Sequence, residues 1–311
     1  MIVLHGATTQ ISGRYKLKKC KKTKTGKEYD IVETGWFDNL ITNTGLNSFL
    51  GANNPIQSVV VGSGNSTPLI TNTALDTLVA DSGSIGIVNY GIYEYSTGLW
   101  CLYANYYKQF DEGEAAGNLQ EVGIYDSNDA LTSRALILDS GGSPTSLTIA
   151  SNEFLTVYYS LRKYPKLTKT TGNVTFTGSK GGSYDYEVLP YINSNCTAYG
   201  SSSSLDVNSF RCFSRPAVLG DFLSDFSGAD QYWYGASYCV QSVLSYISGS
   251  YYRDFRCFFE IADCNDTSHG IQGFRLFIGR CYWKFIFDPY IPKRDTDELT
   301  IIVRTSVART P

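Results

Sequence analysis

The 311-residue sequence has few histidines and no long hydrophobic run. Its two histidines, His5 and His269, lie outside any recognisable Ser- or Cys-nucleophile context, so a His-dependent mechanism has only two candidate bases. No apolar run approaches the roughly 20 residues that a membrane-spanning helix needs. The segment MIVLHGATTQ lacks a basic leader and a small-residue cleavage site, which argues against a secretory signal. We therefore expect synthesis in a cytoplasm and no membrane span.

Motifs for metal, nucleotide and catalytic sites are also missing. Four residues are candidate zinc ligands: Cys257, Cys264, His269 and Cys281. They include no CxxC pair and match no common zinc spacing. Two carboxylate clusters lack any diagnostic arrangement for calcium binding or glycoside cleavage: Asp111–Glu114, and Asp221 with Asp225 and Asp230. The loop Gly62–Thr67 follows an apolar run but lacks the lysine of a phosphate-binding loop. We expect no catalytic residues, no metal-binding residues, no cofactor and no enzyme activity.

The composition is typical of a large β-rich protein. Charged residues make up 18% of the chain, below the roughly 25% of an average domain, which favours a surface covered in part by partners. The formal net charge of −3 argues against a globally basic protein, so we expect no specific nucleic acid partner. Counts of 24 Tyr, 16 Phe and 29 Gly with a single Met favour strands over long helices. One hydrophobic core rarely extends beyond roughly 250–300 residues, so we expect two domains.

The segment from Gly117 to Pro165 gives the clearest strand pattern. Short apolar runs are separated by the polar turns Asp126–Asp129 and Asp139–Pro144, and most residues of Phe154–Leu161 are β-branched or aromatic. A similar pattern closes the chain, where Glu298–Ile302 matches Glu153–Val157, which suggests a tandem duplication. We predict a mostly β fold with two antiparallel β-sandwich-like domains in tandem and one or two short helices. The predicted domains are residues 1–165, with a basic hairpin and a short helix, and residues 166–311, rich in cysteine and aromatic residues.

A long hairpin and a short helix are predicted in the first domain. From Ile11 to Asp38, alternating residues predict two strands joined by a turn at Thr23–Gly26. The stripe of Leu46, Phe49 and Leu50 predicts a helix, with Asn43 or Thr44 as its N-cap and Gly51 as its end. The pattern at Ala74–Ala80 suggests a second helical turn. Ser96–Gly98 is expected to join two further strands.

Eight cationic residues fall between Arg14 and Lys27. A solvated hairpin with a basic outer face accounts for them, and basic residues also deter unwanted pairing at a sheet edge. Alternatively, they dock onto an acidic neighbouring subunit and set its orientation. The candidate docking residues are Arg14, Lys16, Lys18, Lys19, Lys21 and Lys22.

The second half concentrates aromatic residues and six of the eight cysteines. A candidate aromatic platform for a sugar or a protein partner consists of Tyr232, Trp233, Tyr234, Tyr251 and Tyr252, although such residues also fill β-sandwich cores. Candidate disulfide cysteines are Cys196, Cys212, Cys239, Cys257, Cys264 and Cys281. Buried reduced thiols are the alternative, and the sequence does not define which cysteines would pair.

Several segments resemble structural proteins of tailed-bacteriophage virions of the minor tail, tail-fibre and neck or baseplate types. They are WFDNLITNTGL with VVVGSGNSTPLITNTALDT, GEAAGNLQEVGIYD, LTSRALILDSGGSPTSLTIASNEFLTVYYSLRKYP and WKFIFDPYIPKRDTDELTIIVRTSVAR. The resemblance covers most of Thr34–Pro165 and the closing segment from Cys281. It implies a non-enzymatic β-rich subunit of a tail, neck or collar, or baseplate. The expected partners are other virion proteins and copies of this chain.

The same resemblance implies a location in the virion, after assembly in the host bacterial cytoplasm. The alternative is a tail-fibre protein that binds a host-surface receptor or glycan. The motifs are architectural and imply no catalytic residue in this chain.

Overall fold

The computed structural model describes residues 2–51, 54–97, 99–166, 168–176, 182–191, 207–213, 233–234, 240–261, 271–278, 281–293, 296 and 298–310. It is 63% strand, and its described residues contain one short helix. The sheets are several in number and mostly antiparallel. The predicted mostly β class is therefore confirmed.

The chain divides into two compact units. Unit 1 comprises Met1–Thr9, Glu94–Trp100 and Pro165–Val307, and unit 2 comprises Gln10–Tyr93, Cys101–Tyr164 and Ala308–Pro311. The long strands β1 (Ile2–Lys22) and β22 (Leu299–Arg309) contribute residues to both. The division of the chain into folding domains 1–165 and 166–311 stays a prediction.

Unit 2 is built mainly from two sheets. Besides β1, its elements are β2 (Glu28–Glu33), β3 (Phe37–Asp38), β4 (Leu40–Ile41), α1 (Asn43–Leu50), β5 (Ser58–Gly62), β6 (Leu78–Ser84), β7 (Gly86–Ser96), β8 (Leu99–Phe110), β9 (Gly117–Leu119), β10 (Glu121–Tyr125), β11 (Leu131–Leu136), β12 (Leu147–Ile149) and β13 (Phe154–Pro165). One sheet contains β1, β13, β8 and β7 in that order, with β2 and β3 paired to β1. The other has the order β4-β11-β10-β5-β6, and β9 pairs with β12.

Tyrosine rings form the core between these two sheets. Tyr15 of β1 and Tyr159 of β13 are fully buried, with ring centroids 4.9 Å apart, and Tyr106 of β8 lies 6.2 Å from Tyr159. The Tyr15 hydroxyl lies 2.5 Å from Ser133 Oγ of β11 and therefore connects the first sheet to the second. Large aromatic rings bury much apolar area, and a hydroxyl needs a partner when it is buried. This core therefore holds unit 2 together through both packing and hydrogen bonding.

The predicted basic hairpin is confirmed. Antiparallel pairing runs from Lys18–Glu33 to Lys22–Glu28, and the Thr23 and Gly26 N–H groups donate to carbonyl oxygens within the turn. Gly26 has φ 82°, a left-handed conformation that glycine adopts without steric cost. Leu17 is fully buried whereas every residue of β2 after Glu28 is exposed, so this arm has no face in the core.

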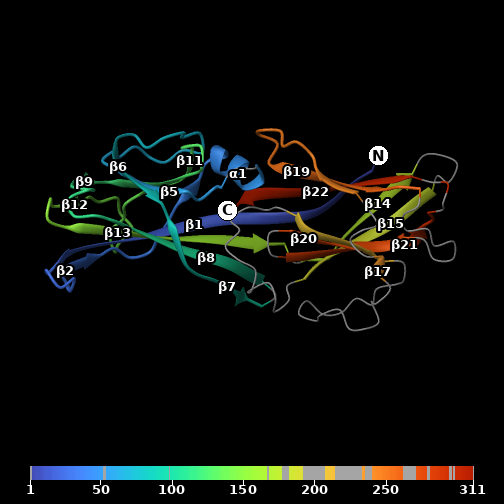
Figure 1. The fold of residues 1–311 in the computed structure, drawn as a ribbon, viewed down its shortest axis with the longest axis horizontal. Helices are drawn as coiled ribbons and strands as arrows, with labels where there is room; N and C mark the ends of the chain where they lie inside the picture. Colours follow the sequence, from blue (N-terminus) through green and yellow to red (C-terminus); the bar gives the residue numbers. More distant parts are fainter. Residues whose placement is uncertain are drawn as a thin grey trace. The chain divides into compact units, whose positions relative to one another are not determined.

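Helix α1 confirms the predicted short helix but corrects its N-cap. The cap is Thr42, which precedes both predicted positions, Asn43 and Thr44, and its Oγ1 accepts from the Gly45 N–H at 2.9 Å. At the other end, the Gly51 N–H donates to the Asn47 carbonyl, as expected for the residue that ends the helix. The helix packs against β11 (Figure 1). A Cβ at Gly45 would lie 2.1 Å from the Thr132 carbonyl oxygen, so only glycine permits this close approach.

The predicted second helical turn at Ala74–Ala80 is wrong. Strand β6 begins at Leu78 and pairs with β5, with Ala80 opposite Val61. The local pattern was compatible with a helical turn, but pairing with a buried neighbouring strand decides the conformation. The three strands predicted within Gly117–Pro165 are present as β10, β11 and β13, and the shorter β9 and β12 occur in addition.

Unit 1 contains a six-stranded sheet and part of a larger one. Its elements, besides the shared strands, are β14 (Thr170–Phe176), β15 (Gly182–Tyr191), β16 (Val207–Phe213), β17 (Trp233–Tyr234), β18 (Val240–Val243), β19 (Tyr252–Phe259), β20 (Ile271–Ile278) and β21 (Cys281–Ile291). The six-stranded sheet has the order β14-β15-β21-β20-β16-β17, and β18, β19 and β22 are neighbours in the larger sheet. Buried aromatic residues line the six-stranded sheet, where the rings of Phe274 and Phe285 stack with their centroids 4.5 Å apart.

Candidate interaction surface

The structure places most of the predicted docking residues in ion pairs within unit 2. Four of the six are paired: Lys16 with Glu33, Lys18 with Glu28, Lys19 with Glu153 and Lys21 with Asp30. Lys22 Nζ donates to Gln109 Oε1 at 2.7 Å and lies 4.6 Å from the centroid of the Phe154 ring. Arg14 stacks on Trp36, with Cζ 4.8 Å from the ring centroid. Carboxylates of the same unit neutralise four of these lysines. The hairpin therefore presents far less positive charge than its sequence suggests.

Strand β2 exposes apolar side chains at a sheet edge. The exposed fractions are 44% for Tyr29, 52% for Ile31, 48% for Val32 and 42% for the following Trp36. Within the described residues, β2 pairs only with β1. The carboxylates of β2 already form ion pairs with lysines of β1. A partner that binds at this edge therefore does not have to remove water from an unpaired carboxylate. An edge strand with free backbone groups and exposed apolar side chains is a surface suited to another chain.

Glu153 gives unit 2 a predicted sensitivity to acid. The Ala150 N–H donates to its carboxylate at 2.8 Å, and this bond, followed by Lys19, lowers the pKa of Glu153. A lowered folded-state pKa contributes stability above the ordinary value near 4.5, and that contribution is lost as the pH falls through the folded value. We expect the wild-type free energy of unfolding to fall more steeply between about pH 5 and pH 3 than that of Glu153→Gln. Denaturant titrations at each pH test this, and parallel pH profiles would contradict it.

The structure describes only part of the predicted aromatic platform. Tyr232 lies outside them, and Trp233 and Tyr234 form β17, which pairs with β16. Tyr251 precedes β19 with φ 54°, and the Tyr252 ring is covered by the Arg304 guanidinium, whose Cζ is 3.5 Å from the ring centroid. Arg304 is held there by Asp254 at 2.8 Å. Tyr252 therefore packs against its own sheet, and the platform stays a prediction.

Three of the six candidate disulfide cysteines lie in strands that the structure describes. Cys196, Cys239 and Cys264 lie outside the described residues, and Cys212 and Cys281 lie in β16 and β21. Cys257 is a buried thiol in β19, and Cys20 and Cys101 are buried free thiols. The described part of the chain contains no disulfide. Cross-linking through the remaining cysteines stays a prediction.

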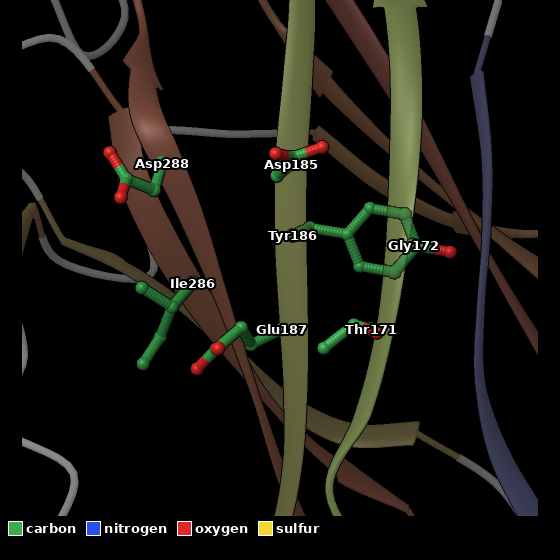
Figure 2. A pocket seen from close by; sticks show the side chains of 7 residues that line it. All are labelled: Thr171, Gly172, Asp185, Tyr186, Glu187, Ile286 and Asp288. Carbon is green, nitrogen blue, oxygen red and sulfur yellow. The ribbon is translucent and has the colours of Figure 1, made fainter.

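A pocket of about 600 Å³ lies over the exposed face of β14, β15 and β21 (Figure 2). Asp185 and Asp288 face each other across β15 and β21, and Glu187 lies two residues along the strand. Asn173 Nδ2 donates to Asp185 Oδ1 at 2.7 Å, and Lys169 forms an ion pair with Glu187. The Tyr186 ring points to the opposite, buried face, toward Gly172. Asp185 and Glu187 therefore each have a protein partner. Within the described ranges, no group of residues is suited to hold a metal ion.

The loop after β5 binds a carboxylate of the chain itself. Glu121 of β10 is fully buried, and its carboxylate accepts from the backbone N–H groups of Gly64, Asp76 and Thr77 at 3.0–3.2 Å. Arg134 of β11, also fully buried, donates to Glu121 at 2.9 Å. From its sequence, this Gly-Ser-Gly loop was interpreted only as lacking the lysine of a nucleotide site.

The buried charges continue from Glu121 to a second carboxylate. Arg134 Nη2 lies 2.6 Å from Asp76 Oδ2, and Nη1 donates to Asn72 Oδ1 at 3.0 Å. Hydrogen bonds from Ser66 and then from Arg134 lower the pKa of Asp76. We call Glu121, Arg134 and Asp76 the carboxylate clamp. A charged residue inside each of two adjacent apolar strands was the sequence signal for it.

Comparisons with known proteins give no relative. No family model, no curated protein and no solved structure matches the chain. Within the described part of the chain, no helix is long and apolar enough to cross a membrane.

Proposed function

We propose that the chain is a non-enzymatic structural subunit of a tailed-phage virion, in the tail, neck or collar, or baseplate, where it holds neighbouring subunits or fibres together. The observation that carries the proposal is the exposed edge strand β2 with Tyr29, Ile31 and Val32. Such an edge gains backbone hydrogen bonds and apolar contacts when a neighbouring chain covers it. The segment resemblance supports the same role, because its motifs belong to virion proteins.

The proposal includes two antiparallel β-sandwich-like domains, one in each unit. In unit 2 it is supported by the tyrosine core between the two sheets and by the Tyr15–Ser133 contact that connects them. In unit 1 it is supported by the stacked Phe274 and Phe285 and by the buried Trp283 on the six-stranded sheet. Rigid sandwiches suit a structural subunit, since function then lies in edges and surfaces.

Purified particles test this proposal. We expect mass spectrometry of gradient-purified virions to find the chain in a fixed ratio to the major structural proteins. The double substitution Tyr29→Lys with Ile31→Lys should lower that ratio at least tenfold if β2 forms a subunit contact, because it places two charges in an apolar interface. Leu69→Lys, at an exposed apolar residue outside β2, serves as the matched control and should leave the ratio unchanged. A chain found only in the lysate and absent from particles would contradict the proposal.

A further inference from the structure

Two arginines on one face of the first sheet of unit 2 form no ion pair with the described residues, although the charge of Asp38, opposite Arg14 in β3, acts to raise the pKa of Arg14. Arg14 lies in β1 and Arg162 in β13, and both side chains are partly exposed. Their Nε atoms are buried without a hydrogen-bond partner, and neither guanidinium forms an ion pair with any residue that the structure describes. Buried donors are nearly always satisfied in folded proteins. The buried Nε atoms are out of reach of another chain, but both side chains are partly exposed, so their remaining guanidinium N–H groups can meet an acceptor from outside the unit.

The two arginines lie on neighbouring strands, and aromatic residues lie beside both. Strands β1 and β13 are neighbours in the sheet, and burial followed by the positive charge of Arg162 lowers the pKa of Arg14. Arg14 stacks on Trp36 at 4.8 Å, and Arg162 is the register partner of Tyr103 on β8. Tyr103 in turn lies 5.8 Å from Tyr93. Like charges held together in a partly buried site are stabilised by a bound anion.

The chemistry of this site fits a carboxylate on a protein surface. Guanidinium groups form paired hydrogen bonds with carboxylates, and such charge-assisted bonds are the strong ones. Arginine, tyrosine and tryptophan together are the residues that contribute most to protein–protein binding energy. The site lies on a face of the first sheet of unit 2.

The chain itself presents a matching acidic turn. Asp111 and Glu112, between β8 and β9, are exposed, and neither carboxylate has a partner among the described residues. Within one unit the two features cannot meet, since Tyr103 and Phe110 lie on the same strand about 23 Å apart at the rise of an extended chain. A contact between them requires two molecules.

We propose that the Arg14–Arg162 pair binds the Asp111–Glu114 turn of a second copy of this chain. The contact is head-to-tail, because the two surfaces differ, so it propagates into a ring or a row of copies. This contact adds a specific interface to the proposed structural role. The place of the contact in a particle rests on that role. The contact itself is a property of the isolated chain, so its failure and the failure of the virion proposal are distinguishable.

Sedimentation equilibrium of the full-length chain at low ionic strength tests the contact. We expect wild type to self-associate, and Arg14→Gln with Arg162→Gln, or Asp111→Asn with Glu112→Gln, to weaken association at least tenfold, as loss of charge-assisted hydrogen bonds implies. Lys16→Gln, next to Arg14 but paired with its own Glu33, is the matched control and should change association less than threefold. Near-ultraviolet circular dichroism verifies that each variant is folded.

A charge exchange makes the test specific. The variants Arg14→Glu with Arg162→Glu, and Asp111→Lys with Glu112→Lys, should each associate with themselves poorly but bind each other when mixed. A monomeric wild-type chain, unaffected association in the arginine variants, or an equal loss in Lys16→Gln would overturn the proposal. So would a monomeric chain that binds an oligogalacturonate through Arg14 and Arg162, because the site would then belong to an acidic sugar. Arg162→Lys replaces any arginine variant that does not fold and should still weaken association.

Discussion

Replacing Arg134 with alanine is expected to lower the free energy of unfolding of unit 2 by about 3–5 kcal/mol, because it leaves Glu121 as a buried charge without its cation. Both side chains are fully buried, so no solvent screens the remaining carboxylate. The clamp also supports the loop after β5 through Ser66 and Asn72, and this loop should lose its order in the variant. Denaturant titration with hydrogen-exchange mass spectrometry measures both effects.

The control for this prediction is the exposed ion pair of Lys16 and Glu33. Lys16→Ala should change the free energy of unfolding by less than about 1 kcal/mol, as is usual for surface ion pairs. A second variant separates charge from volume. Arg134→Met with Glu121→Leu removes both charges but deprives the Gly64, Asp76 and Thr77 N–H groups of their acceptor, so it should remain destabilised. If Arg134→Ala is as stable as wild type, the clamp does not stabilise unit 2.

Tyr159→Ala is expected to cost about 3–5 kcal/mol, the usual loss for a large aromatic residue removed from a packed core. Its ring lies between those of Tyr15 and Tyr106, and it also covers Gly13, where a Cβ would lie 2.5 Å from the hydroxyl. Truncation therefore leaves a cavity where the first sheet meets the second. We expect the backbone amides of β1 and β13 to exchange hydrogen faster along the whole of each strand.

Tyr107→Ala is the matched control, because Tyr107 lies on the adjacent strand β8, 47% exposed. Its loss removes little buried area and should cost less than about 1 kcal/mol. Equal stabilities for the two variants would mean that the tyrosine core is not the centre of unit 2.

Local patterns in the sequence predict those parts of the fold that local forces determine. Alternation around Tyr15 and Leu17, and the turn that ends at Gly26, define the basic hairpin before any contact is known. The apolar stripe of Leu46 and Phe49 likewise predicts helix α1. The segment at Ala74–Ala80 was mispredicted because its strand β6 depends on pairing with β5, which no local window contains.

The candidate surface could be predicted only in part, because charge pairing depends on tertiary structure. The sequence reveals eight cationic residues between Arg14 and Lys27, but not that β2 carboxylates neutralise three of the lysines. Arg162 is 148 residues from Arg14 in the chain, so no motif joins them; strand order brings them onto one sheet face. Glu121 and Arg134 stand out in the sequence as charged residues within apolar strands, but only the pairing of β10 with β11 shows that they meet.

The central claim is that this chain is a structural part of a virion, and its location on intact particles tests that claim most directly. Purified particles would be labelled with a gold-conjugated antibody against an epitope outside β2 and imaged by electron microscopy. We expect gold at the tail, the neck or the baseplate in a regular number per particle. Unlabelled particles that also lack the chain by mass spectrometry would contradict it, and gold confined to fibre tips would favour receptor binding instead.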